Sequence, residues 1–315
     1  MNPRLRLGLL IVALAGVASL CTHAQEGDAE FLVLSGGRLI DGTGAEPVED
    51  AAIVIRGSRI VYAGPSTDIE LPTGADVIDV GGLTVLPGFI NAHVHGGTDP
   101  SNLEAWAWQG VTTVRVLGAT AATLRRFRHL YPPTPERARL VAAGPLITVP
   151  GGYPTVPFGS STAAPILSPE DARRLAEDLL DDGADLLKLA LETGTVFGRN
   201  IPVMSLAEAS MLVRVAHGRG TVASAHITSV VDIDLALDAG VDDLAHMAVD
   251  RALPDETLER LVGQSVLWVP TLELWQCTGQ SSMEVGNLPR FVRAGGEVDL
   301  GKDLEGYKCS WELGM

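Results

Sequence analysis

The pattern of hydrophobic and polar residues changes character near residue 85. Before it, short apolar stretches alternate with glycine-rich breaks such as Gly36-Gly37 and Gly81-Gly82. Such stretches predict short β-strands, because apolar runs bounded by turn residues are typical of strands. The expected strands cover 31–34, 38–40, 52–55, 59–63 and 77–80. We therefore predict a small N-terminal β-sandwich domain over residues 25–84.

Beyond residue 85, strand-like runs alternate with helix-like segments. We expect eight strands, at 89–95, 111–117, 140–148, 186–191, 222–227, 243–248, 266–272 and 298–303. Helices are predicted at 168–182, 205–219, 230–239 and 254–262, where serine or aspartate precedes acidic residues and glycine often follows the last turn. Regular alternation of this kind indicates an α/β class with parallel strands, and eight strands predict a (β/α)8 TIM-like barrel over residues 85–315.

The first 24 residues have the pattern of a secretory signal peptide. Arg4 and Arg6 precede an apolar stretch over 7–20, and small residues lead to an expected cleavage after Ala24. The apolar stretch is shorter than the roughly 20 residues that a spanning helix needs, and Cys21 leaves a lipoprotein as the second interpretation. We therefore expect an exported protein, periplasmic or secreted, without stable membrane insertion.

Two cysteines, Cys277 and Cys309, follow the leader. In an oxidising compartment they could pair, and two separate thiols fit the sequence equally well. The formal net charge is −16. This acidic balance argues against nucleic acid as a partner, because a nucleic-acid-binding surface needs to be basic.

A His-x-His motif formed by His93 and His95 ends the first strand predicted after residue 85. Residues i and i+2 of a strand point to the same face roughly 6 to 7 Å apart, so two imidazoles can converge on one metal ion. Taken alone, such a motif is more often an ordinary pair of polar residues. Further ligands at other strand ends are needed to support a metal site.

Four further candidate ligands end or nearly end other predicted strands: Lys188, His226, His246 and Asp303. The carboxyl ends of parallel strands are where a barrel carries its active-site residues. His129 and His217 instead lie in helix-like stretches, and we interpret them as surface or packing residues. The long irregular loop 149–159 follows the third barrel strand and is expected to border the substrate pocket, unless it is a simple surface excursion.

These motifs together resemble the amidohydrolase superfamily, and within it the imidazolonepropionase-like and prolidase-like branch. The resemblance runs from about Phe31 to the end of the chain. It rests on the segments 87–95, 110–115, 150–152, 183–185, 239–241 and 269–272. It implies a (β/α)8 barrel beside a β-sandwich, with one or two divalent metals and a small-molecule or dipeptide substrate.

Carried over residue by residue, the resemblance assigns His93 and His95 to a first metal and His226 and His246 to a second. Lys188 would bridge the two metals and Asp303 would complete the first site. A lysine at the bridging position favours the two-metal, prolidase-like branch. Zinc suits this histidine-rich set, although manganese, iron or cobalt could also fill it.

Lys188 can bridge two metals only in a modified form. As an ammonium it would repel cations, but a neutral amine in a desolvated site can add carbon dioxide and become a carbamate with two oxygens. The alternative is a lysine that pairs with Asp185 or Asp303. In the favoured scheme, a water shared by the metals is acidified toward hydroxide, and Asp303 serves as the acid/base that moves its proton to the leaving amine.

The family generally continues well past the eighth strand, whereas this chain ends at Met315. We therefore expect a truncated form in which the C-terminal helix and sandwich strands are missing. The leading hypothesis is a metal-dependent amidohydrolase that cleaves an amide or peptide C–N bond, as a dipeptidase or an N-acyl amino acid hydrolase does. The alternatives are a deaminase, a cyclic-amide or lactone hydrolase, or a non-catalytic fragment. The oligomeric state, including a homo-oligomer, stays open.

Overall fold

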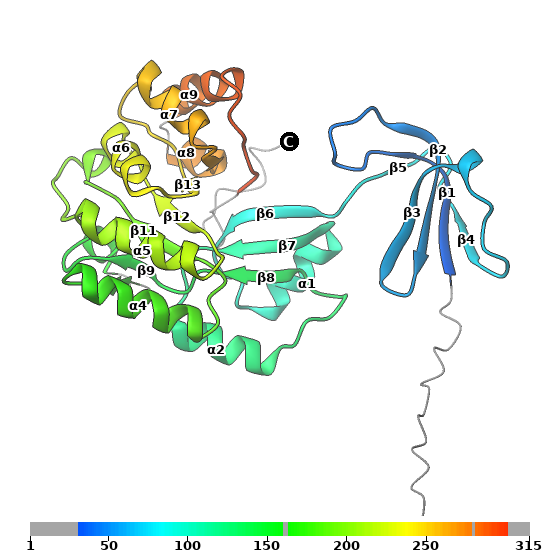
Figure 1. The fold of residues 1–315 in the computed structure, drawn as a ribbon, viewed down its shortest axis with the longest axis horizontal. Helices are drawn as coiled ribbons and strands as arrows, with labels where there is room; N and C mark the ends of the chain where they lie inside the picture. The colour runs from blue at the N-terminus through cyan, green and yellow to red at the C-terminus, as the bar shows by residue number, and fades with distance from the viewer. Residues whose placement is uncertain (1–30, 160–162, 279–280, 302–315) are drawn as a thin grey trace, which may run out of the picture. The chain divides into compact units, whose positions relative to one another are not determined.

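The computed structural model describes residues 31–159, 163–278 and 281–301. The chain divides into two compact units, one that ends at Pro87 and one that begins at Gly88 (Figure 1). The predicted leader, Cys309 and Asp303 lie outside the described residues. Each unit is built around its own strands.

The first unit contains a five-stranded sheet in the order β3-β2-β1-β4, with β5 also paired to β1. Its strands are β1 (Phe31–Leu39), β2 (Val48–Arg56), β3 (Arg59–Pro65), β4 (Asp76–Asp79) and β5 (Thr84–Val85). Strand β2 runs antiparallel to β1 and β3, whereas β4 and β5 run parallel to β1. A short 3-10 helix, η1 (Ser66–Asp68), follows β3.

The prediction of separate strands over 31–34 and 38–40 was wrong, because both belong to β1. The register of β1 against β2 shifts between Ser35 and Leu39, as in a β-bulge. Gly36 has a φ of +85°, and a Cβ on Gly37 would lie 2.9 Å from the Val80 side chain. The two glycines therefore let the strand continue through the bulge beside a close neighbour, instead of ending it.

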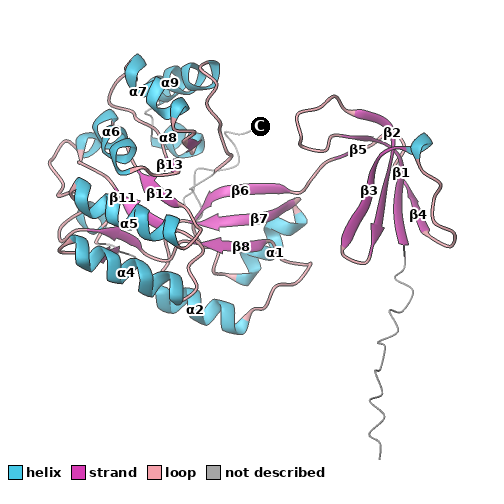
Figure 2. Cartoon of the chain, viewed as in Figure 1, coloured by secondary structure: helices cyan, strands magenta, loops and turns pink. Residues whose placement is uncertain are grey.

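The second unit contains two parallel sheets (Figure 2). The three-stranded sheet has the order β6-β7-β8, and the six-stranded sheet has the order β10-β9-β11-β12-β13-β14. Their strands are β6 (Phe89–Val94), β7 (Val111–Val116), β8 (Arg139–Ala142), β9 (Leu146–Thr148), β10 (Ala163–Pro165), β11 (Leu187–Ala190), β12 (Ala223–His226), β13 (Asp243–Ala245) and β14 (Leu267–Val269). Most of the predicted strands are thus present at the predicted places, though shorter.

Two of the strand predictions differ from the structure. The strand expected over 140–148 is divided into β8 and β9, because Gly144 between them takes a left-handed φ of +74°. The strand expected over 298–303 is, in its described part, only an isolated parallel bridge between Val298 and Trp268. The Ala92 N–H donates to the Leu300 carbonyl at 2.7 Å, so this segment lies beside both β14 and β6.

Helices follow most of these strands. They are α1 (Pro100–Trp108), α2 (Ala121–Leu130), α3 (Thr155–Phe158), α4 (Pro169–Asp181), α5 (Leu206–Gly218), α6 (Val230–Ala239), α7 (Asp255–Gly263), α8 (Leu272–Thr278) and α9 (Ser281–Arg293), with a 3-10 helix η2 (Thr195–Phe197) after β11. Ser168, Ser205 and Ser229 cap α4, α5 and α6 through their side chains, as the sequence predicts. No helix in the described part of the chain is long and apolar enough to cross a membrane.

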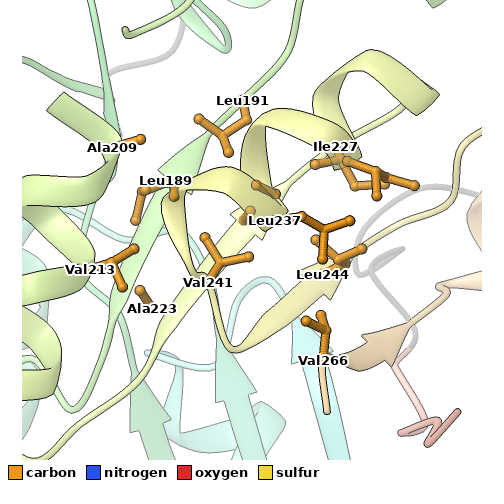
Figure 3. Close-up of a cluster of buried hydrophobic side chains, with 14 of the residues drawn as sticks. Leu189, Leu191, Ala209, Val213, Ala223, Ile227, Leu237, Val241, Leu244 and Val266 are labelled. Carbon is orange, nitrogen blue, oxygen red and sulfur yellow. The ribbon is translucent and has the colours of Figure 1, made fainter. Parts of the chain in front are cut away.

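The main hydrophobic core lies between β11, β12 and β13 and the helices that cover them. Figure 3 shows Leu189, Ala223 and Leu244 from the strands beside Val213 and Leu237 from α5 and α6. The register places Leu189, Ala225 and Leu244 next to one another across the three strands, and all three are fully buried. Because side chains alternate along a strand, the residues between them point to the other face. That face carries the polar residues Lys188, Ser224 and Asp243.

Candidate active site

Four histidines come together at the carboxyl ends of β6, β12 and β13. The ring centroid of His93 lies 5.5 Å from that of His95 and 4.7 Å from that of His246. The His246 ring in turn lies 4.6 Å from the His226 ring. His93, His226 and His246 are almost completely buried. The arrangement brings together four of the six predicted metal ligands, although they come from strands that are far apart in the sequence.

The backbone at His246 is held in an unusual conformation. His246 directly follows β13 and has a φ of +74°, and Thr271 has a φ of +46°. Left-handed backbone is uncommon for any residue except glycine, and it is a real outlier for a β-branched threonine. The two residues are joined by a 2.9 Å hydrogen bond between His246 Nδ1 and Thr271 Oγ1. This bond leaves Nε2 as the ring nitrogen on the side of His246 away from Thr271.

Lys188 lies on β11 and is 1% exposed. Its Nζ donates to Ser224 Oγ at 3.2 Å, and the Ser224 hydroxyl donates to Asp243 Oδ1 at 2.6 Å. Asp185, one of the two pairing candidates for Lys188, instead pairs with Arg128 at 2.6 Å and accepts the Ala142 N–H.

Arg115 continues this network across to the other sheet. Its guanidinium donates two hydrogen bonds to Asp243, at 2.9 and 3.1 Å, and its Nε donates to the Ala92 carbonyl at 2.7 Å. Ala92 directly precedes His93, so the network joins the backbone beside His93 to Lys188. Both side chains of the ion pair are largely buried, and bidentate geometry of this kind is specific to arginine.

Glu192 is a buried carboxylate that the sequence analysis missed. It follows β11, its side chain is fully buried, and its Oε2 lies 3.5 Å from His226 Nε2. The Gly194 N–H donates to Oε1 at 2.6 Å, and the Thr228 hydroxyl donates to Oε2. Burial raises the pKa of Glu192, but the hydrogen bond and charge of His226, together with Thr228 and Gly194, hold that pKa below its usual value.

A second buried carboxylate, Asp232, lies near Glu192. It accepts hydrogen bonds from Thr193, from the Thr228 N–H and from the Ser229 N–H. Burial and the negative charge of Glu192 raise the pKa of Asp232 to about 6. Asp232 therefore organises the backbone on which Glu192 and Thr228 are carried.

The predicted loop over 149–159 reaches the histidine cluster through Tyr153. The Tyr153 ring stacks on the His226 ring with a centroid distance of 4.0 Å and an interplanar angle of 16°. On another side of the cluster, the Trp275 ring contacts His246 edge-on at 6.4 Å. The loop thus borders the histidine cluster, and aromatic rings flank two of its members.

The two remaining histidines of the described residues lie in helices, as the sequence predicts. His129 is exposed on α2, and His217 on α5 contacts the Asp242 carboxylate at 3.0 Å. Among the described residues, no group of three His, Cys, Asp or Glu side chains could hold one metal ion. A scheme that gives each metal two histidines is compatible with this finding, because its remaining ligands are a modified Lys188 and Asp303, which lies outside the described residues.

Comparison with known proteins gives relatives that are acylases, imidazolonepropionases and a deaminase. The chain is 29% identical over 300 residues to the N-acyl-D-glutamate deacylase of Alcaligenes xylosoxydans xylosoxydans, which covers 89% of this chain and 57% of that protein. It is 34% identical over 113 residues to the imidazolonepropionase of Pseudomonas savastanoi pv. phaseolicola, with 32% of this chain and 28% of that protein covered. No family model matches the chain.

A solved structure of a Xaa-Pro dipeptidase with bound methionine superposes with a TM-score of 0.70 at 21% identity. The superposition covers 87% of this chain and 80% of the dipeptidase. The resemblance to the amidohydrolase superfamily, in its imidazolonepropionase-like and prolidase-like branch, is confirmed. The parallel α/β architecture matches that of these amidohydrolases. The chain spans just over half the length of its deacylase relative and less of the imidazolonepropionase.

Proposed function

We propose that this chain is a metal-dependent amidohydrolase that cleaves an amide or peptide C–N bond of a small molecule, as a dipeptidase or an N-acyl amino acid hydrolase does. The observation that carries the proposal is the histidine cluster, in which the ring centroids of His95, His93, His246 and His226, taken in this order, lie 4.6 to 5.5 Å apart. The relatives named as acylases and imidazolonepropionases support this reaction class.

The proposal includes two divalent metals, of which zinc is the first choice. Imidazole nitrogens are good ligands for zinc, and the buried ends of parallel strands are a suitable place for them. His93 and His95 would hold one metal, and His226 and His246 the other. Lys188 as a carbamate would contribute one oxygen to each, and Asp303 would complete the first site. The described chain reaches this site at Gly301, where a Cβ would lie 2.8 Å from the Cβ of His93.

The architecture completes this proposal. We take β6, β7, the consecutive pair β8 and β9, β11, β12, β13, β14 and the segment at Val298 as the eight strand positions of a (β/α)8 barrel, with β10 as an additional strand beside β9. The Ala92 N–H to Leu300 carbonyl bond and the Asp185 N–H to Ala142 carbonyl bond, at 2.7 and 2.8 Å, support closure at both edges between the two sheets. In such a barrel, the carboxyl ends of the strands carry the chemistry.

When bound, the metals supply an acidified water and polarise the substrate carbonyl. Side chains of the protein would transfer protons and hold the metal ligands in position. Asp303 would take a proton from the attacking water and return it to the leaving amine. Ser224, held by Asp243, accepts the Lys188 Nζ hydrogen bond and fixes the direction of that side chain.

Glu192 would orient His226. Its Oε2 lies 3.5 Å from Nε2, so a proton on Nε2 faces the carboxylate and Nδ1 is left to bind a metal. A histidine ligand usually donates its other ring N–H to a carboxylate or carbonyl, and this contact fixes the tautomer and the ring direction. Glu192 is therefore a positioning residue in this proposal.

A second candidate function is a deaminase or cyclic-amide hydrolase on the same scaffold. It is favoured by a 36% identical match over 85 residues to the 5-methylthioadenosine/S-adenosylhomocysteine deaminase of Symbiobacterium thermophilum, which covers 24% of this chain and 20% of that protein. We also propose export, supported by the leader-like pattern over residues 2–24.

The deciding experiment is elemental analysis of purified protein grown with added zinc and bicarbonate, followed by a panel of dipeptides, N-acyl amino acids, cyclic amides, lactones and nucleosides. Two metals per chain and hydrolysis of an N-acyl amino acid or a dipeptide are expected. Activity lost in a folded Asp303→Asn variant supports the proton role, and full activity in that variant removes it. A folded protein without metal and without activity refutes the proposed function.

A further inference from the structure

Three aromatic side chains extend from the histidine cluster toward solvent. Tyr153 stacks on His226, and Phe158 and Phe197 each contact the Tyr153 ring, at centroid distances of 5.9 and 6.1 Å. Phe158 and Phe197 also meet edge-to-face at 5.9 Å. We call Tyr153, Phe158 and Phe197 the aromatic triad. It belongs to neither the metal ligands nor the hydrophobic core.

The three rings of the aromatic triad differ in exposure. Tyr153 and Phe197 are half-buried, whereas Phe158 is 63% exposed. A phenyl ring in water loses the stabilisation that burial would give, so an exposed aromatic cluster beside a reaction site indicates a surface that a ligand covers. The apolar surface begins at a proposed metal ligand and continues outward from it.

The two segments that carry the triad are tightly built. A Cβ on Gly152 would lie 2.3 Å from Thr148 Oγ1, and one on Gly194 would lie 2.1 Å from the Arg199 carbonyl. Gly194 and Gly198 flank η2 in left-handed conformations, with φ values of +89° and +62°. Such close packing constrains the backbone next to Tyr153 and Phe197, and a pre-positioned backbone lowers the conformational entropy lost on binding.

The same segments are uncharged. No Asp, Glu, Lys or Arg occurs over residues 149–159 or 193–198. A subsite for a charged side chain needs a charged or polar partner, whereas apolar ring faces and edges attract neutral apolar groups. The chemistry of the triad therefore selects against a carboxylate or an ammonium on the group that it binds.

We propose that the aromatic triad is a subsite for a neutral aromatic or bulky apolar group of the substrate, on the His226 side of the candidate active site. The proposal rests on the proposed amide hydrolysis, because it names the kind of substrate that this reaction would take. Phe158 and Phe197 determine specificity by packing against the group, and Tyr153 joins this surface to the histidine cluster.

The first test compares N-acetylalanine with N-phenylacetylalanine and with N-acetylphenylalanine as substrates of the metal-loaded protein. We expect at least one added phenyl group to raise kcat/KM about tenfold or more, since one aromatic contact is worth roughly a factor of ten. Phe158→Ala and Phe197→Ala should each remove most of that gain, so that the ratio of kcat/KM between the phenyl-bearing substrate and N-acetylalanine falls toward one. Trp108→Ala, which removes an 85% exposed aromatic residue on α1, is the matched control and should change neither rate.

The second test needs no turnover and separates this proposal from the proposed function. Phenylacetohydroxamate and acetohydroxamate differ only in the phenyl group, and both bind metals through the hydroxamate. Calorimetry should give at least about tenfold tighter binding of the phenyl compound, lost in Phe158→Ala. If this preference appears without any amide hydrolysis, the subsite stands and the proposed function fails. Equal affinities, binding of neither compound, or equal kcat/KM values with active protein overturn the subsite.

Discussion

The two faces of β11, β12 and β13 are equally buried but chemically opposite. On one face, Leu189, Ala225 and Leu244 form a row of neighbours that packs against the helices. On the other, Lys188, Ser224 and Asp243 form the neighbouring row. The apolar row needs only close packing, whereas the polar row is tolerable because hydrogen bonds join its members to one another and to Arg115.

Stability and chemistry therefore come from alternate residues of the same strands. The apolar row, on the outer face that packs against the helices, keeps the strands in place. The polar row, on the inner face, ends at the histidines. Substitutions on the two faces should therefore affect different measurements.

The largest effect is expected on the inner face. Lys188→Ala and His226→Ala should each lower the rate of amide hydrolysis on the order of 1000-fold, because several kcal/mol of transition-state stabilisation depend on the metals. Metal content should fall below two per chain in both variants, as measured by elemental analysis. His129→Ala removes an exposed histidine of α2 and is the control. An active His226→Ala variant with full metal content would remove His226 from the site.

On the outer face, Leu244→Ala should lower the free energy of unfolding by about 2 to 5 kcal/mol, because it leaves a cavity in a fully buried position. The metal content of the folded fraction should not change. Val231→Ala on α6 removes a 51% exposed side chain and should change the unfolding free energy by less than about 0.5 kcal/mol. Denaturant titration measures both. Loss of metal in folded Leu244→Ala would show that the two faces are not independent.

A pH-dependent effect is expected at Asp232. Because its pKa is raised from 3.8 to about 6, the folded protein holds this proton more tightly than the unfolded chain does. The stabilisation from the bound proton is complete below about pH 4 and is lost as the pH rises through about 6. The unfolding free energy of the wild type minus that of Asp232→Asn should therefore fall by up to about 3 kcal/mol between pH 4 and 7. A difference that stays constant across this range would contradict the shift.

The smallest effect is expected at Glu192. Glu192→Gln keeps the shape of the side chain but removes the charge that faces His226, and it should weaken metal binding about 10- to 100-fold. Competition with a chelator measures the affinity without any need for turnover. Glu177→Gln, which alters a surface ion pair with Arg173 on α4, is the matched control. Unchanged affinity in Glu192→Gln would exclude the positioning role.

Most of the parallel strands and the four histidines at their ends could be predicted from sequence. Apolar runs such as the one before His226 are short and end at a polar residue. A strand and its end can therefore be recognised from neighbouring residues alone. The serine caps of α4, α5 and α6 are local in the same way. Such features need no knowledge of distant contacts.

Glu192 and Arg115 could not be recognised in the same way. Glutamate after an apolar run is ordinary, and only the contact with Thr228, 36 residues away, makes Glu192 part of the site. The signal that could have found it is its place just beyond a strand that carries another candidate ligand. Similarly, the sequence alone is compatible with Arg115 of β7 pointing to solvent. Only the fold shows that its partner is Asp243 from the other sheet.

The ion pair between Arg115 and Asp243 connects residues 128 positions apart in the chain. Closing so long a loop costs entropy before the contact forms, so pairings of this kind belong to the late steps of folding. The His93 strand and the His246 strand meet only when that step is complete. If the two metals bind as proposed, with Lys188 as their bridge, the complete site forms only after the two sheets have docked, and metal uptake by a refolding chain would report on that docking.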